Sequence, residues 1–180
     1  MKILIINGKP RTGKSTFCNV AMQKRGLVYS YSTIDEIKEI AAQLGWNGEK
    51  DEKSRKFLSD LKDAMTEFND RPHQRIVEEI EKKCEKYKDT PEIMNRMIFL
   101  VQSREPDDIE RWQKENNAKA ILIRSNNELT DKVWSNHADD DVYDCAYDYI
   151  IDNIETLDEW KETIGWFMEQ IGREKWESHI

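Results

Sequence analysis

The stretch that decides the fold is KILIINGKPRTGKS, residues 2–15. Residues 3–6 form an unbroken apolar run rich in β-branched side chains and followed closely by Gly8, a pattern typical of a parallel strand buried on both faces. Gly8 to Ser15 then matches G-x-x-x-x-G-K-[ST], and residues 14–24 change to helical spacing. Strand, glycine-rich loop and helix therefore follow one another in the order that a phosphate-binding loop requires.

The residue types in this loop suit the phosphate chain of a nucleotide. Glycines let the backbone wrap around phosphates without Cβ clashes, and the amides of the loop and the helix N-terminus can donate to them. We expect Lys14 to neutralise the β- and γ-phosphates of ATP and the Ser15 hydroxyl to join the shell of a bridging Mg²⁺. The predicted nucleotide-binding residues are Gly8, Lys9, Arg11, Thr12, Gly13, Lys14, Ser15 and Thr16.

Strand-like and helix-like segments alternate along the rest of the chain. Strands are predicted at residues 2–7, 27–31, 97–101, 118–123 and 149–151, with helices between and after them. This alternation predicts an α/β fold, a three-layer sandwich around a mostly parallel five-stranded sheet. Together with the phosphate-binding loop, this architecture resembles the P-loop NTPase or nucleotide kinase fold. We expect a single domain over residues 1–180, with a helical acceptor-binding region at about 32–96.

Two of the predicted helices have a clear apolar side. The helix at 51–69 carries an apolar stripe that includes Phe57 and Phe68, and it presents Arg55, Ser59 and Lys62 on its other face. The closing helix, with Leu157, Trp160, Ile164 and Phe167 on its apolar side, has Asn153 or Thr156 as its candidate cap. The acidic stretch at about 125–148 fits either a lid over a ligand or a solvated loop.

The charge of the chain argues against polyanionic partners. The 180 residues hold 28 basic and 36 acidic side chains, a net charge of −8, which disfavours coating a nucleic acid polymer or an anionic membrane. Residues 1–25, however, carry six basic side chains and no acidic one, while the rest of the chain holds the other 22 basic and all 36 acidic residues, a net −14. The local positive charge coincides with the phosphate-binding loop, so small anions remain suitable partners.

Cysteine usage and hydropathy point to the cytoplasm. Cys18, Cys84 and Cys145 are odd in number, widely spaced and without a CxxC pair, which fits reduced, buried thiols better than disulfides or a zinc site. No apolar run approaches the ~20 residues of a spanning helix. We therefore expect a cytoplasmic protein with no membrane partner, and the oligomeric state stays open, with a homodimer as one option.

Negative signals narrow the classes of P-loop protein. The chain has no guanine-reading N-K-x-D, and the apolar run at 97–101 does not end in the Asp of a motor but is followed by Gln102 and Ser103, then Arg104, Glu105 and Pro106. The carboxyl ends of parallel strands form the ligand crevice of α/β folds. Arg104 could there clamp donor and acceptor phosphates and Glu105 could hold a Mg²⁺-bound water, or Arg104 could simply pair with Asp107 or Asp108.

Several further segments carry a resemblance to a known family. They are the loop itself, Ser32-Thr33-Ile34-Asp35, the run from Arg55 to Asp63, the Arg104-Glu-Pro turn, and Asp148-Tyr-Ile-Ile-Asp-Asn153 before a last helix near Thr156. In this order and spacing the chain resembles the small P-loop deoxynucleoside monophosphate kinases of the bacteriophage type. These enzymes are similar in fold to adenylate and thymidylate kinases and move the γ-phosphoryl group of ATP to a deoxynucleotide.

The resemblance implies roles for individual residues. Ser32, Asp35 and the face of Arg55, Ser59 and Lys62 would border the acceptor, and Arg104 would contact its phosphate. Related kinases often carry several lid arginines before the last strand, whereas here Arg124 and Lys132 are the only basic residues between the fourth and fifth strands. The expected charge-stabilising set is then Lys14, Arg104 and Arg11, with Arg124 also at the acceptor.

Asp35 leaves the type of acceptor open. It would read the sugar of a monophosphate acceptor, act as general base toward a nucleoside or another small alcohol, or cap its helix. The sequence thus favours a kinase that makes ADP and dNDP from ATP and a dNMP. The alternatives are a P-loop kinase of a nucleoside or another small metabolite, and a catalytically silent nucleotide-binding regulatory protein.

Overall fold

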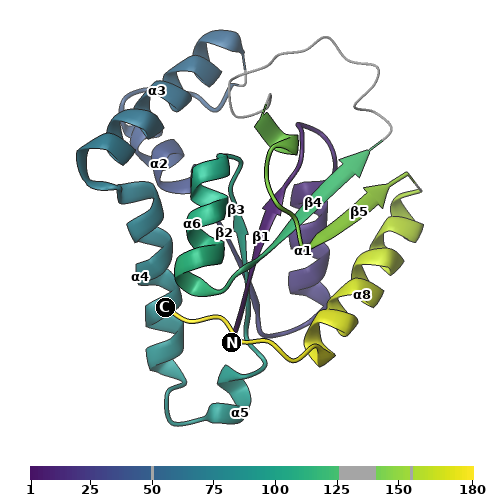
Figure 1. Cartoon of the computed structure of the whole chain (residues 1–180). Coiled ribbons are helices and arrows are strands. Elements are labelled where there is room, and N and C mark those ends of the chain that lie inside the picture. The colour runs from purple at the N-terminus through teal and green to yellow at the C-terminus, as the bar shows by residue number, and fades with distance from the viewer. Residues whose placement is uncertain (50, 126–140, 155) are drawn as a thin grey trace.

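A five-stranded sheet, parallel throughout, forms the centre of the molecule in the computed structural model (Figure 1). The structure describes residues 1–49, 51–125, 141–154 and 156–180. The strand order is β2-β3-β1-β4-β5, with β1 at Lys2–Asn7, β2 at Val28–Ser32, β3 at Ile98–Gln102, β4 at Lys119–Ser125 and β5 at Tyr149–Asn153. The predicted α/β fold class is confirmed, and the sheet expected to be mostly parallel is entirely so.

Helices cover both faces of the sheet, and two more stand at its carboxyl edge (Figure 1). They are α1 (Lys14–Lys24), α2 (Asp35–Gln43), α3 (Glu52–Asn69), α4 (Arg71–Lys86), the short α5 (Pro91–Met94), α6 (Pro106–Asn116) and α8 (Leu157–Arg173), with a 3₁₀ turn η2 at Asp141–Tyr143. α1 and α8 lie on one face and α4 and α6 on the other, while α2 and α3 stand near the ends of β2 and β3. The sequence did not predict α5.

β1 separates two hydrophobic cores. Because side chains alternate along a strand, Leu4 and Ile6 face α1 and α8, whereas Ile3 and Ile5 face α4 and α6. All four are fully buried, and burial of one such side chain stabilises the fold by roughly 1.5–3 kcal/mol. The expected strand buried on both faces is therefore present, and it delivers Gly8 to the centre of the carboxyl edge.

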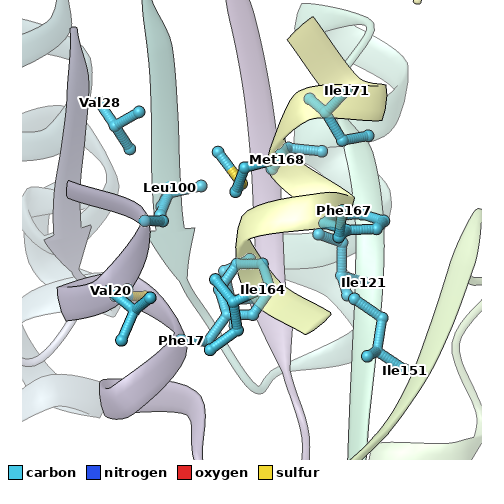
Figure 2. Close-up of a cluster of buried hydrophobic side chains, with 14 of the residues drawn as sticks. Phe17, Val20, Val28, Leu100, Ile121, Ile151, Ile164, Phe167, Met168 and Ile171 are labelled. Carbon is cyan, nitrogen blue, oxygen red and sulfur yellow. The ribbon is translucent and has the colours of Figure 1, made fainter. Parts of the chain in front are cut away.

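Aromatic and aliphatic side chains pack α1 against the sheet and against α8, its neighbour on the same face (Figure 2). The Phe17 ring lies 5.9 Å from the Phe167 ring and 6.3 Å from the Trp160 ring, measured between centroids. Ile164 and Met168 pack in the same cluster. This packing holds the start of α1, and with it the loop that precedes α1, at a fixed place above the sheet.

The closing helix begins with a capping box. The Thr156 hydroxyl accepts from the Glu159 backbone amide, and the Glu159 carboxylate accepts in return from the Thr156 amide at 3.0 Å. Of the two candidate caps, Thr156 is therefore the cap, and the Asn153 side chain points instead to the loop after β1, where it donates to the Thr12 carbonyl.

Some apolar residues expected to be buried are exposed. No residue of α3 is fully buried, and Phe68 is 85% exposed, because α3 packs on α2 and α4 and not on the sheet. Leu157 in the first turn of α8 is 59% exposed for a similar reason, since the sheet meets that helix only from Trp160 onward. Cys18 is buried as expected, but Cys84 and Cys145 are only half-buried.

In the part of the chain that the structure describes, every helix is too short or too polar to cross a membrane.

Candidate active site

Two glycines determine the shape of the loop between β1 and α1. Gly8 has φ +145° and Gly13 has φ +100°, values that side chains rarely allow. A Cβ atom on Gly8 would collide with the Ile123 carbonyl oxygen and lie 2.9 Å from the Thr12 hydroxyl, and one on Gly13 would lie 2.6 Å from Asn153 Nδ2. The loop is therefore wrapped tightly against the ends of β4 and β5, as a phosphate-binding loop requires.

The N-terminus of α1 has the features of an anion-binding site. Gly13 is its N-cap and supplies no side-chain acceptor, and the first turn contains no acidic residue. The helix dipole and the first amide groups are thus not offset by a negative side chain of that turn, which favours a bound phosphate. Ser15 in this turn is exposed and Thr16 is half-buried, so both predicted hydroxyl ligands are accessible from the loop.

The cations of the loop point in different directions. Lys14 folds back over its own loop, where Nζ donates to the carbonyl oxygens of Lys9, at 2.6 Å, and Gly8. The Lys9 ammonium lies 4.9 Å from the centre of the Tyr143 ring, a cation–π contact with η2. Arg11 is exposed and adopts φ +66°. Lys14 thus already holds its charge where the loop would surround a phosphate chain.

The donor set fits Mg²⁺ that is held mainly by phosphates and water. Among the described residues, no three His, Cys, Asp or Glu side chains are grouped to hold a metal ion. Mg²⁺ commonly keeps several waters and takes only one or two protein ligands beside substrate phosphates. Ser15 is suited to that part, whereas Glu105, predicted to hold a Mg²⁺-bound water, has its Oε1 atom 3.4 Å from the ammonium of Lys62.

The structure brings three predicted residues together at the end of β3. Lys62 reaches from α3 to Glu105, at 3.4 Å, and to Asp108, at 3.7 Å. Asp108 also accepts from the Ser103 hydroxyl at 3.1 Å. Arg104 lies between these groups in sequence and is partly buried. Lys62 and the turn at 103–105 therefore form one polar cluster, although the sequence had placed them on separate segments.

The start of α2 corrects one prediction. Asp35 is the first residue of the helix and not its cap, which is Ile34. The Asp35 carboxylate turns back and accepts from the Ser32 amide at 3.0 Å, while its side chain remains 59% exposed. The other predicted acceptor residues, Arg55 and Ser59, lie on α3 with Lys62, Arg55 exposed and Ser59 half-buried.

Arg124 is engaged across the sheet. It stands opposite Asp152 in the β4–β5 register and donates to both oxygens of that carboxylate, at 2.7 and 2.8 Å. The guanidinium holds the pKa of Asp152 below its usual value by donating to the charged form. Since both side chains are nearly half exposed, the pair contributes at most ~1 kcal/mol, and Arg124 can exchange this partner for a ligand at little cost.

A cavity of about 360 Å³ lies between β2, α2 and α4. Its lining includes Tyr31, Ser32, Asp35, Glu36, Arg75 and Glu79. Arg75 is 3.2 Å from Glu36 and 3.8 Å from Glu79, so one cation serves several carboxylates. Burial raises the pKa of Tyr31 to about 12, with Glu79 adding to the shift, so the phenol stays protonated.

Sequence reasoning missed three residues that support the loop. Asn7 is fully buried at the end of β1, and its side chain contacts both Gly8 and the Tyr147 hydroxyl. Asn153 donates to the Thr12 carbonyl at 3.0 Å. The sequence does show a polar residue at the end of a buried strand at positions 7 and 153, which could have marked both as candidate site residues. Nothing in the sequence indicates that their hydrogen-bond partners lie about 140 residues away.

One predicted region falls largely outside the described residues. The stretch at 125–148 was proposed as a lid or a solvated loop, and its residues 126–140, which include Lys132, Asp139 and Asp140, lie in the undescribed part of the chain. The described remainder, from η2 onward, lies next to the phosphate-binding loop through Tyr143 and Tyr147. The lid stays a prediction.

Comparison with known proteins bears on the fold. No family model matches this chain, and no curated protein matches it. Among solved structures, a candidate kinase from Chloroflexus aurantiacus is similar at a TM-score of 0.50 and 14% identity, over 94% of this chain and 97% of that one. At this identity the likeness extends to the fold alone, and it agrees with the predicted fold class.

Two weaker similarities were also found. Shikimate kinase from Aquifex aeolicus aligns with a TM-score of 0.47 and 11% identity over 96% of this chain and 99% of its own. A sugar kinase from Janibacter aligns with a TM-score of 0.47 and 10% identity over 94% and 95%. These values are too low to say anything about a substrate.

Proposed function

We propose that this protein is an ATP-dependent phosphotransferase that passes the γ-phosphoryl group to a small acceptor, and that the acceptor is a deoxynucleoside monophosphate. The observation that carries the proposal is the loop from Gly8 to Thr16. It combines two glycine conformations, an α1 N-terminus without acidic residues and a lysine folded over the loop. The name of the structurally similar protein from Chloroflexus aurantiacus, a candidate kinase, agrees with this class.

The predicted charge-stabilising residues each have a role in this proposal. The loop amides and Lys14 bind the β- and γ-phosphates and offset the charge that develops during transfer. The Ser15 hydroxyl would hold Mg²⁺, which would neutralise part of the phosphate charge. Arg104, at the end of β3, aligns the acceptor with the γ-phosphate, and Arg11 and Arg124 supply further positive charge. A monophosphate acceptor is already anionic and needs this alignment rather than a general base.

The monophosphate acceptor is supported by the cations that come from the elements at the carboxyl edge. Arg55 and Lys62 come from α3, and Arg104 comes from the turn after β3. Lys62 must exchange its contacts with Glu105 and Asp108 to bind a phosphate, which is feasible because these N–O distances, 3.4 and 3.7 Å, are long for a charge-assisted hydrogen bond. The resemblance to deoxynucleoside monophosphate kinases points to the same acceptor.

A second candidate is a kinase that acts on a small alcohol without phosphate. It is favoured by the cavity beside β2, whose lining holds the carboxylates of Asp35, Glu36, Glu39 and Glu79 and one cation, Arg75. Arg71 and Lys82, outside the lining, also pair with Glu36 and Glu79, so the described lining of the cavity presents paired carboxylates and no free cation of the kind that a phosphate needs. In this case the exposed carboxylate of Asp35 would accept the proton of the acceptor hydroxyl. The two candidates differ in whether the acceptor must carry a phosphate.

The test is the release of ADP, coupled to an optical signal, with the common deoxynucleoside monophosphates, the matching nucleosides and a panel of small alcohols. The proposal expects acceptor-dependent ADP release with at least one monophosphate and none with the matching nucleoside. Lys14→Ala serves as the inactive control. Release with a nucleoside or a simple alcohol but no monophosphate would support the second candidate. Tight ATP binding with no acceptor-dependent release would instead identify a silent nucleotide-binding protein.

A further inference from the structure

A chain of hydrogen bonds runs from the first residue of the phosphate-binding loop to the segment before β5. The Gly8 amide donates to Asn7 Oδ1 at 2.7 Å, and Asn7 Nδ2 donates to the Tyr147 hydroxyl at 2.6 Å. That hydroxyl in turn donates to the Val142 carbonyl at 2.5 Å. In this chain the Asn7 amide nitrogen donates and the Asn7 amide oxygen accepts, which determines the orientation of the Asn7 amide, and the Tyr147 hydroxyl both accepts and donates.

The surroundings make this chain rigid. Asn7 and Val142 are fully buried, and Tyr147 is half-buried against the core beneath α6. Burial raises the pKa of Tyr147, so its hydroxyl keeps the proton that it donates. An unsatisfied buried amide costs about 1–3 kcal/mol, so Asn7 would not give up Tyr147 without a replacement.

The chain acts on the point where the loop leaves β1. Gly8 sits at φ +145° between the Ile123 carbonyl and the Thr12 hydroxyl, and its amide hydrogen bond holds it in that conformation. A displacement of about 1 Å in a site that aligns phosphates can cost a factor of about 10² in rate. Lys9, the next residue, is held to the same segment by its contact with the Tyr143 ring.

We infer that Asn7 and Tyr147 are positioning residues for nucleotide binding. Together they hold Gly8, and through it the phosphate-binding loop, in register with the segment from Val142 to Tyr147. Neither side chain contacts the nucleotide, and both act through the backbone of Gly8. This inference rests on the proposed function only in that the loop binds ATP, and it does not depend on which acceptor is used.

The experiment compares Tyr147→Phe with Tyr149→Phe. The first change removes only the hydroxyl that links Asn7 to Val142. The second removes a hydroxyl that contacts Lys119 and Glu174, away from the loop, and is the matched control. MgATP affinity is measured by calorimetry and thermal stability by melting, for both variants and the wild type. We expect Tyr147→Phe to weaken MgATP binding about five- to tenfold, and Tyr149→Phe to leave it within twofold.

A double-mutant cycle separates positioning from a general loss of stability. Asn7→Ala, Tyr147→Phe and the double variant should show non-additive losses of MgATP affinity, with the double variant close to the weaker single one. Additive losses, or equal affinity in Tyr147→Phe and wild type, would overturn the inference. If the folded wild-type protein does not bind MgATP, both the proposed function and this inference are wrong. That result differs from the two above, in which the wild type binds MgATP and only the variants decide.

Discussion

Gly13 begins α1 in a left-handed conformation, and two side chains close off the space beside it. A methyl group there would lie 2.6 Å from Asn153 Nδ2 and 3.2 Å from Trp160 Nε1. We expect Gly13→Ala to destabilise the fold by about 1–3 kcal/mol and to abolish measurable MgATP binding, because the loop must open to relieve the contact. Calorimetry and thermal melting test this. Gly26→Ala is the control, since a Cβ there meets no atom within 4 Å, and equal losses in both variants would contradict it.

A second prediction concerns the role of Arg104 in catalysis. If it aligns the transferring group, Arg104→Ala should lower kcat by about 10²–10³-fold while changing the KM for ATP less than threefold. Steady-state kinetics with saturating acceptor measure both constants. Arg96→Ala, an exposed position before β3 and at the opposite end of that strand, should behave as wild type. A wild-type kcat in the Arg104 variant would remove Arg104 from the catalytic set.

The predictability of single residues depended on their spacing along the chain. The loop could be predicted because Gly8, Gly13, Lys14 and Ser15 lie within eight residues of one another in a single motif, and the glycine conformations agree with it. The supports of the loop, from Asn7 to Tyr147 and from Asn153 to Thr12, span 140 and 141 residues. Only the folded sheet, which brings the ends of β1 and β5 near each other, reveals them.

α3 differs from the other long helices in what holds it. α8 buries five side chains, whereas α3 buries none completely and contacts the turn after β3 through Lys62. We expect the amides of α3 to exchange with deuterium at least about tenfold faster than those of α8, because few buried contacts oppose local opening. Addition of the acceptor should slow exchange in α3 selectively. Equal protection of α3 and α8 without ligand would contradict this view.

The same contrast explains which elements the sequence predicted well. Strands at 97–101 and 118–123 are apolar runs buried by helices on both faces, so composition alone located them within one or two residues. The apolar stripe of α3 predicted a helix correctly, but none of the residues of this helix is fully buried. Periodicity reports that one helix face is apolar, and it does not report whether a sheet or only two other helices lie against that face.

At the scale of the whole molecule, the uneven distribution of charge determines which anions can bind. The first 25 residues carry +6 and contain the phosphate-binding loop, and the remaining residues carry −14. We expect no binding of a fluorescent 30-base-pair DNA at about 0.15 M salt by anisotropy, because the acidic surface repels a polymer while the loop admits a small anion. A labelled ATP analogue should bind under the same conditions. DNA binding in the micromolar range would contradict this assignment of partners.

The most direct test follows the γ-phosphoryl group itself. ATP labelled with ³²P at the γ-position is incubated with Mg²⁺, the protein and the panel of deoxynucleoside monophosphates, and the products are separated by thin-layer chromatography. We expect label in a deoxynucleoside diphosphate with wild-type protein and none with Lys14→Ala. Label that remains in ATP with every acceptor, in protein shown to be folded and to bind ATP, would contradict the phosphotransferase assignment.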